Sequence, residues 1–135
     1  MKFITTTRAT AVPASYIYLE RDGKILIGRR CNTGYCDGCY QLPAGHVEDG
    51  ELPLAAIIRE AQEEYELRLN KDFCRLLFVQ PHPVIQNETE YIFFCSIDSE
   101  QQPVLHEGAE MKWMTLAEVK SVHLGFGDES ITPKL

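Results

Sequence analysis

One amphipathic segment, residues 52–67, separates two groups of strand-forming segments in this sequence. Apolar residues recur along it with the spacing of one helical face, which predicts a helix packed against a core. These residues are Leu54, Ile57, Ile58, Ala61 and Tyr65. Pro53 suits the first turn, where its missing N–H costs nothing. Because strands precede and follow this helix, the order of elements favours an α/β (α+β) fold with helices packed on a mixed sheet.

The predicted strands are short and end at recognisable turns. Residues 14–19 and 24–28 are rich in strand formers, and Asp22-Gly23 between them is a strong hairpin-turn signal. Residues 32–38 are predicted to form a loop. A short helix over residues 115–120 would begin with a capping box of Thr115 and Glu118. Further strands are expected at 40–42, 74–79, 90–97 and 111–114.

Size and composition predict a single domain over residues 1–135. With 44% hydrophobic and 24% charged residues, the chain has the composition of a soluble globular protein. No run approaches the roughly 18 apolar residues of a membrane span, and residues 1–14 lack the pattern of a secretory signal. We therefore expect a cytoplasmic protein that does not bind membranes. The five cysteines are an odd number in a chain without such a signal, so reduced thiols are expected.

Nearly all of the net charge of −7 lies in one segment. Residues 46–66 contain seven acids and one base, so this segment carries −6 and the rest of the chain carries −1. Stable nucleic-acid binding is not expected, because it needs a basic surface that neutralises phosphates. A local concentration of carboxylates needs a local explanation.

The acidic residues Glu60, Glu63 and Glu64 share one face of the predicted helix, beside its apolar stripe. Like charges at this spacing destabilise a helix by a few tenths of a kcal/mol per pair, and one arginine cannot neutralise three carboxylates. A hard divalent cation can, and Mg²⁺ commonly shares its shell between carboxylates and substrate phosphates. The spacing alone leaves two interpretations open, half of a metal site or a solvated acidic helix face.

The same segment resembles the Nudix box. That pattern runs Gly, five residues, Glu, seven residues, Arg-Glu, an apolar residue, any residue, Glu-Glu, any residue, Gly and an apolar residue. Here residues 45–67 supply Gly45, then Glu51, and then the run Arg59-Glu60-Ala61-Gln62-Glu63-Glu64-Tyr65-Glu66-Leu67. The lead-in over residues 42–48 also looks like that of the Nudix family. The resemblance implies a Nudix-like α/β/α sandwich with a mixed central sheet.

The resemblance also implies roles for single residues. Glu60 and Glu64 would be the main ligands of Mg²⁺, which Mn²⁺ could replace. Glu63 would belong to the same cluster, and the backbone carbonyl of Ala44 would be a further ligand. Arg59 would pair with Glu51 and orient the carboxylates. The implied reaction is attack by a metal-activated water on a phosphoanhydride of a nucleoside triphosphate or another nucleoside-diphosphate derivative.

Two further residues, Glu107 and Glu66, lead to separate expectations. Some family members use a loop glutamate as general base, and Glu107, six residues before Trp113, has the spacing of the nucleoside-triphosphate-cleaving type; an exposed loop acid is the alternative. Glu66 stands where the family has Gly, so the helix is expected to run on to Asn70, which tolerates a left-handed conformation.

Other residues are open to two interpretations. Arg29 could bind substrate phosphate or simply face solvent. Cys31, Cys36 and Cys39 with His46 could bind zinc, but no second C-x-x-C pair supports this. The substrate could instead be a nucleotide sugar or dinucleoside polyphosphate, or the chain could be a non-catalytic module that senses a nucleotide. Pairing of edge strands into a homodimer is also compatible with the resemblance.

Overall fold

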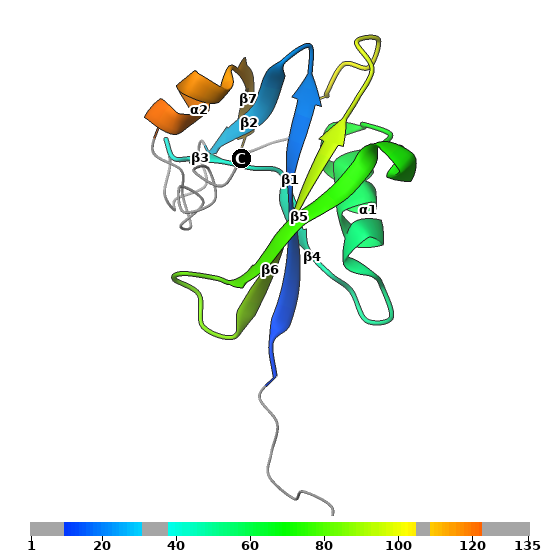
Figure 1. Cartoon of the computed structure of the whole chain (residues 1–135), viewed down its shortest axis with the longest axis vertical. Coiled ribbons are helices and arrows are strands. Elements are labelled where there is room, and N and C mark those ends of the chain that lie inside the picture. The colour runs from blue at the N-terminus through cyan, green and yellow to red at the C-terminus, as the bar shows by residue number, and fades with distance from the viewer. Residues whose placement is uncertain (1–9, 31–37, 105–108, 123–135) are drawn as a thin grey trace, which may run out of the picture.

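The computed structural model describes residues 10–30, 38–104 and 109–122, which form one sheet flanked by helices (Figure 1). The helices are α1 (Pro53–Tyr65), the 3-10 helix η1 (Lys71–Phe73) and α2 (Leu116–Ser121). The strands are β1 (Val12–Arg21), β2 (Lys24–Arg30), β3 (Tyr40–Gln41), β4 (Ala44–His46), β5 (Cys74–Pro81), β6 (Glu88–Ser96) and β7 (Ala109–Met114). All predicted helices and strands are present, and β4 is an additional strand that the sequence did not predict. The predicted loop at 32–38 lies outside the described residues except for its last position.

The seven-stranded sheet is mixed. β1 pairs with β6 in parallel along nearly its whole length, and the remaining pairs are antiparallel. The β1–β2 hairpin turns at Asp22 and Gly23, whose φ angles of 52° and 79° are those of the twisted two-residue turn that their sequence predicts. β5 lies at one end of the strand order, beyond β6.

Residues 40–46 lie between β1 and β2 where these two strands diverge. The two strands pair only near their turn, through Glu20–Ile25 and Arg21–Lys24. Farther from the turn β3 pairs with β2, and β4 pairs with β1 from Ala14 to Tyr16. The backbone groups that the diverging strands leave unpaired are thus satisfied by this insertion. The insertion also places β4 directly beneath α1.

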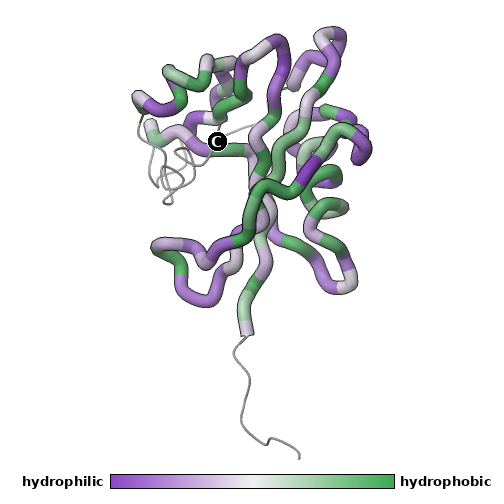
Figure 2. The backbone as a smooth tube through the Cα atoms, viewed as in Figure 1, coloured by the Kyte–Doolittle hydropathy of each residue, from purple (hydrophilic) through white to green (hydrophobic). Residues whose placement is uncertain are grey.

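Each face of the sheet carries one hydrophobic cluster and one helix. Alternation along β1 sends Ile17 and Leu19 to the α1 side and Tyr16 and Tyr18 to the α2 side. The first side packs on Ile57 and Ala61 of α1, and the second packs on Val119 of α2. Hydrophobic residues accordingly gather along the central strands and recur along α1 (Figure 2). The expected α/β/α sandwich with a mixed central sheet is confirmed.

Helix α1 ends earlier than the sequence predicted. The helix ends at Tyr65 and does not run on to Asn70, because Glu66 itself adopts the left-handed conformation, with φ 54° and ψ 34°. This sharp exit turns Leu67 and Leu69 into the core beneath the helix, where both are buried. Burial of these two side chains favours the turn over another helical turn, although a glutamate there is unfavourable.

The capping box of α2 is confirmed, with Thr115 Oγ1 accepting from the Glu118 N–H and the Glu118 carboxylate accepting from the Thr115 N–H. None of the helices in the described ranges is long and apolar enough to cross a membrane.

Candidate active site at the junction of β4 and α1

Gly45 in β4 lies directly against the Glu60 side chain of α1. A Cβ atom at this position would lie 2.2 Å from Cγ and Cδ of Glu60 and 2.5 Å from its Oε1. The Glu60 side chain therefore occupies the space that any other residue at position 45 would fill. This contact gives a physical reason for the glycine at the start of the motif, since its φ angle is not in the left-handed region.

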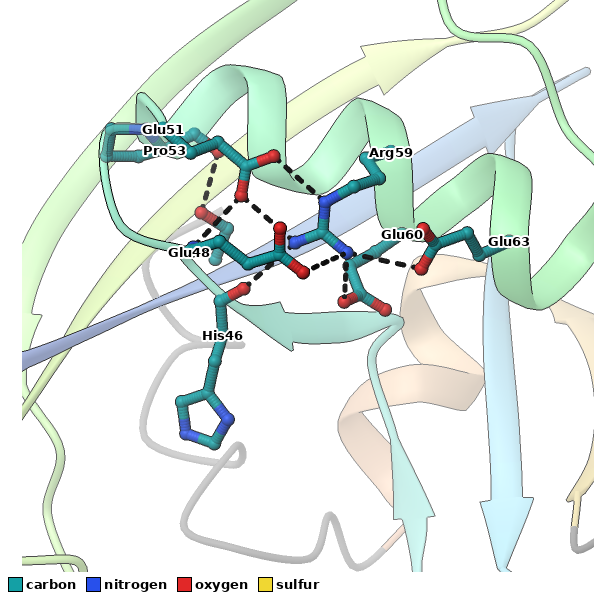
Figure 3. Close-up of polar contacts among 8 residues, drawn as sticks. His46, Glu48, Glu51, Pro53, Arg59, Glu60 and Glu63 are labelled. Atoms are coloured by element: carbon teal, nitrogen blue, oxygen red, sulfur yellow. Dashed lines mark hydrogen bonds and ion pairs between the residues drawn. The ribbon is translucent and has the colours of Figure 1, made fainter.

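Arg59 lies at the centre of the carboxylates (Figure 3). Its Nε and Nη2 donate to the two oxygens of Glu51 at 2.9 and 3.0 Å. Its Nη1 donates to Glu60 at 2.9 Å and to Glu63 at 3.2 Å, and the Glu48 carboxylate lies 3.6 Å away. Nη2 also donates to the backbone carbonyl of His46 at 3.1 Å. The predicted pairing of Arg59 with Glu51 is present, and the same guanidinium ties α1 to β4.

The polar contacts shift the pKa values of three groups in this cluster. Hydrogen bonds from Arg59 and from the Glu48 backbone lower the pKa of Glu51 to about 2. Burial raises the pKa of Glu60, an effect that Arg59 opposes and that the charges of Glu63 and Glu64 reinforce. The pKa of Arg59 is raised, chiefly by its bonds to Glu51. A cation beside Glu60 would therefore oppose the effect of burial on this carboxylate.

The remaining predicted ligands lie around Glu60. Glu63 and Glu64 are exposed on α1, and Ala44 is exposed next to Gly45 in β4. Glu64 is close enough to Glu60 for its charge to contribute to the pKa shift there. As the side chains stand, no three acids, histidines or cysteines of the described ranges converge as they would around one metal ion. One oxygen of Glu60 and one oxygen of Glu63 accept from Arg59 Nη1.

Tyr65 borders this cluster, although its spacing assigned it only to the apolar face of the helix. It packs with the α1-side core, and burial together with the charges of Glu64 and Glu60 raises its pKa to about 12. Its hydroxyl also lies near Gly28 of β2, at 3.7 Å from where a Cβ would stand. The cluster is therefore bounded on this side by a neutral phenol.

Arg29 lies on β2 and is half exposed. It forms an ion pair of 3.3 Å with Glu110 of β7, and its Nε donates to the Gly38 carbonyl at 3.5 Å. No contact in the described ranges joins it to Arg59 or the α1 carboxylates. Glu107, the predicted general base, lies outside the residues that the structure describes.

One of the described cysteines differs from the expectation that the thiols are reduced. Cys39 is disulfide-bonded, so the expectation of reduced thiols is wrong for it, and a disulfide sulfur is not the thiolate that zinc binds. Cys31 and Cys36 lie outside the described residues. Cys74 and Cys95 are free thiols, as expected.

A second polar cluster was not identified from the sequence. Glu88, the first residue of β6, is buried with its side chain only 6% exposed. Its carboxylate lies 2.9 Å from His46 Nε2 and 3.7 Å from His82 Nε2, and it accepts from the Tyr16 hydroxyl at 3.4 Å. The signal available in the sequence was weak, because these residues come from four separate segments and share no spacing pattern.

Nearly the whole chain is similar to a known protein family. Residues 9–135 match the NUDIX domain family. Nudix hydrolase 5 of Arabidopsis thaliana is 26% identical over 107 residues, which are 74% of this chain and 34% of that protein. The 8-oxo-dGTP diphosphatase of Proteus vulgaris is 27% identical over 81 residues, 60% of this chain and 70% of that protein.

The matched region covers 27% to 38% of the first three curated relatives, so those proteins are much longer than the stretch they share with this chain. A solved structure from a study of MutT of Aliivibrio salmonicida and Vibrio cholerae has a TM-score of 0.73 at 18% identity, and covers 92% of this chain and 94% of that chain. At this identity the likeness concerns the fold alone.

Proposed function

We propose that this chain, which belongs to the NUDIX domain family, hydrolyses a phosphoanhydride bond of a nucleotide with the help of Mg²⁺. The observation that carries the proposal is the set of contacts made by Arg59. One guanidinium holds Glu51 on one side and Glu60 and Glu63 on the other, opposite Gly45. This is an ordered carboxylate cluster rather than a set of independent solvated side chains.

The donor set fits a hard divalent cation. The cluster contains Glu48, Glu51, Glu60, Glu63 and Glu64, and Arg59 is its only base within residues 46–66. Burial and neighbouring charges already raise the pKa of Glu60, so a cation beside it would remove an unfavourable interaction. In this proposal Glu60, Glu63, Glu64 and the Ala44 carbonyl hold the ion. When bound, it would lower the pKa of a water and neutralise phosphate charge.

The chain's own residues would orient this site. Arg59 fixes the direction of Glu60 and Glu63, and Glu51 fixes Arg59 through two parallel hydrogen bonds. Glu51 would remain ionised at neutral pH, because its pKa of about 2 lies far below. Both residues would therefore act by positioning, without exchanging protons during turnover.

The remaining assignments complete the proposal. Glu107 would serve as general base or as a further ligand, and Arg29 would contact substrate phosphate from β2. The substrate class is a nucleoside triphosphate or another nucleoside-diphosphate derivative, in keeping with the name of the Proteus relative. Residues 1–135 would act as one domain on a small molecule, without stable nucleic-acid or membrane binding.

A panel of nucleotides tests this function. Nucleoside triphosphates, ADP-ribose and dinucleoside polyphosphates would be incubated with Mg²⁺, and release of pyrophosphate and phosphate would be measured. Hydrolysis that EDTA abolishes is the expected result. Glu60→Gln should lower turnover by at least about 100-fold, and Glu107→Gln should do the same if it is the base. The exposed Asp72→Asn, in η1, is a matched control that should retain full activity.

Binding without cleavage would contradict the proposal. If calorimetry detects a nucleotide complex while no product forms with Mg²⁺ or Mn²⁺, the chain is a nucleotide-sensing module. Glu60→Gln with unchanged turnover would remove the α1 cluster from the reaction.

A further inference from the structure

The buried carboxylate of Glu88 lies on the opposite side of β4 from Arg59, yet a continuous chain of contacts through His46 joins the two. Glu88 lies at the start of β6, where the β5–β6 connection returns to the sheet and the His82 N–H donates to the Glu88 carbonyl at 2.8 Å. A buried charge is costly unless hydrogen-bonded groups surround it. Here the Tyr16 hydroxyl and the rings of His46 and His82 surround the carboxylate with groups that can donate hydrogen bonds.

His82 shows how specifically this pocket is built. Its Nδ1 accepts from the N–H groups of Val84 and Ile85 at 3.0 and 2.8 Å. A neutral imidazole that accepts at Nδ1 carries its proton on Nε2. That Nε2 is buried, has no hydrogen-bond partner among the described residues, and lies 3.7 Å from Glu88. The ring therefore presents an N–H dipole to the carboxylate from one side.

His46 connects this pocket to the acidic cluster. Its Nε2 lies 2.9 Å from Glu88, while its backbone carbonyl accepts from Arg59 Nη2 at 3.1 Å. The two contacts leave β4 in opposite directions, as Figure 3 shows for the imidazole ring and the carbonyl. His46 is also the last residue of the three-residue strand β4, from Ala44 to His46, which carries Gly45.

We propose that Glu88 is a positioning residue for the α1 site, acting through His46 on Arg59 and on β4. This inference rests on the proposed function, because it assigns Glu88 to the same metal-dependent site. Glu88 fixes the His46 ring, the His46 carbonyl fixes one Arg59 nitrogen, and Arg59 directs Glu60 and Glu63. The position of the Ala44 carbonyl depends on the same strand. Groups that hydrogen-bond a metal ligand directly change metal affinity by about 10- to 100-fold when they are removed, and Glu88 lies further out, so we expect an effect no larger than about 10-fold.

Direct metal binding to the free protein is the first test. Glu88→Gln keeps the size of the side chain but replaces one acceptor oxygen with an NH₂ group that faces other donors. The dissociation constant for Mn²⁺, measured by calorimetry, is expected to rise by up to about 10-fold. In nucleotide hydrolysis, kcat should fall and the Mg²⁺ concentration for half-maximal activity should rise, while KM for the nucleotide changes less.

Glu90→Gln is the matched control. Glu90 is also buried, lies two residues further along the same strand, and accepts from Gln80 at 2.9 Å. A general loss of packing would affect both variants, so only an effect confined to Glu88 supports positioning. Equal weakening of Mn²⁺ binding in the two variants would overturn the proposal.

The His46 side chain provides a second route that does not depend on burial. It is 68% exposed, so His46→Ala should fold even if Glu88→Gln does not. His46→Ala should weaken Mn²⁺ binding in the same way, and His46→Gln, which keeps a donor near the Nε2 position, should restore most of it. If the wild-type protein is active and His46→Ala binds Mn²⁺ with the same affinity as the wild type, the positioning role is contradicted. A wild-type protein that binds Mn²⁺ but cleaves no nucleotide contradicts only the proposed function.

Discussion

Replacing Gly45 by alanine adds a single methyl group where β4 faces the Glu60 side chain of α1. The added Cβ would lie 2.2 Å from Cγ and Cδ of Glu60, whereas ordinary van der Waals contact begins at 3.4 Å. The Glu60 side chain must therefore move by about 1 Å. These atoms are the far end of a flexible side chain, so Glu60 can give way, but the oxygen that must move, Oε1, is the one that accepts from Arg59 Nη1 at 2.9 Å.

The size of the effect follows from this displacement. Overpacking typically costs about 1–3 kcal/mol of folding free energy, and a clash with the end of a flexible side chain lies at the low end of this range. A displacement of about 1 Å in a group that orients reactants can lower turnover by about 100-fold. We therefore expect Gly45→Ala to be folded, slightly destabilised and nearly inactive.

Urea unfolding and nucleotide hydrolysis with Mg²⁺ measure the two effects. Gly28→Ala is the matched control, because its Cβ would meet its nearest neighbour, the Gln41 carbonyl, at an ordinary 3.6 Å. It should lose less than about 1 kcal/mol and keep most of its activity.

The double variant Gly45→Ala/Glu60→Ala tests whether the clash with Glu60 causes the loss of stability. Removing the Glu60 side chain vacates the space that the new methyl group needs, so the double variant should be more stable than Gly45→Ala and remain inactive. Such coupling is expected only for residues in contact. If Gly45→Ala were as active and stable as the wild type, or if its stability loss simply added to that of Glu60→Ala, the clash would not be the cause.

Three further predictions concern stability and thiol chemistry. Glu66→Gly should raise the free energy of unfolding by up to about 1 kcal/mol in urea titrations, because glycine adopts the left-handed conformation without the steric penalty that glutamate has there. The bond that lowers the pKa of Glu51 from 4.5 to about 2 contributes stability above pH 4.5, and this is lost as the pH falls towards 2. Melting curves of Glu51→Gln should therefore show a weaker decline over that interval than those of the wild type. Cys74 and Cys95 are cross-strand partners with sulfur atoms 2.7 Å apart, so hydrogen peroxide should join them in a disulfide that peptide mass mapping detects, and Cys95→Ser should abolish it.

Much of the fold could be predicted because local patterns and tertiary packing agree. The apolar spacing of α1, the Asp22-Gly23 turn and the capping box at Thr115 each describe interactions within a few residues, and each is present in the structure. The short strand β4 was not predicted, because three residues give no periodicity. Its pairing with β1 depends on the divergence of β1 and β2, which leaves this part of β1 free to pair with β4. The helix end was predicted wrongly, since burial of Leu67 outweighed the local preference against a left-handed glutamate.

The chemical groups of the α1 site could be predicted from the order of residues, because the acidic face of α1 follows directly from helical geometry. The partners Arg59 and Glu51 could be predicted too, through a motif whose spacing the structure retains. The reason for Gly45 emerged only from the folded chain, since the contact with Glu60 depends on how β4 lies beneath α1. The same is true of the contact between Glu88 and His46, because side chains 42 positions apart meet only when parallel and antiparallel strand pairing has placed them in one sheet.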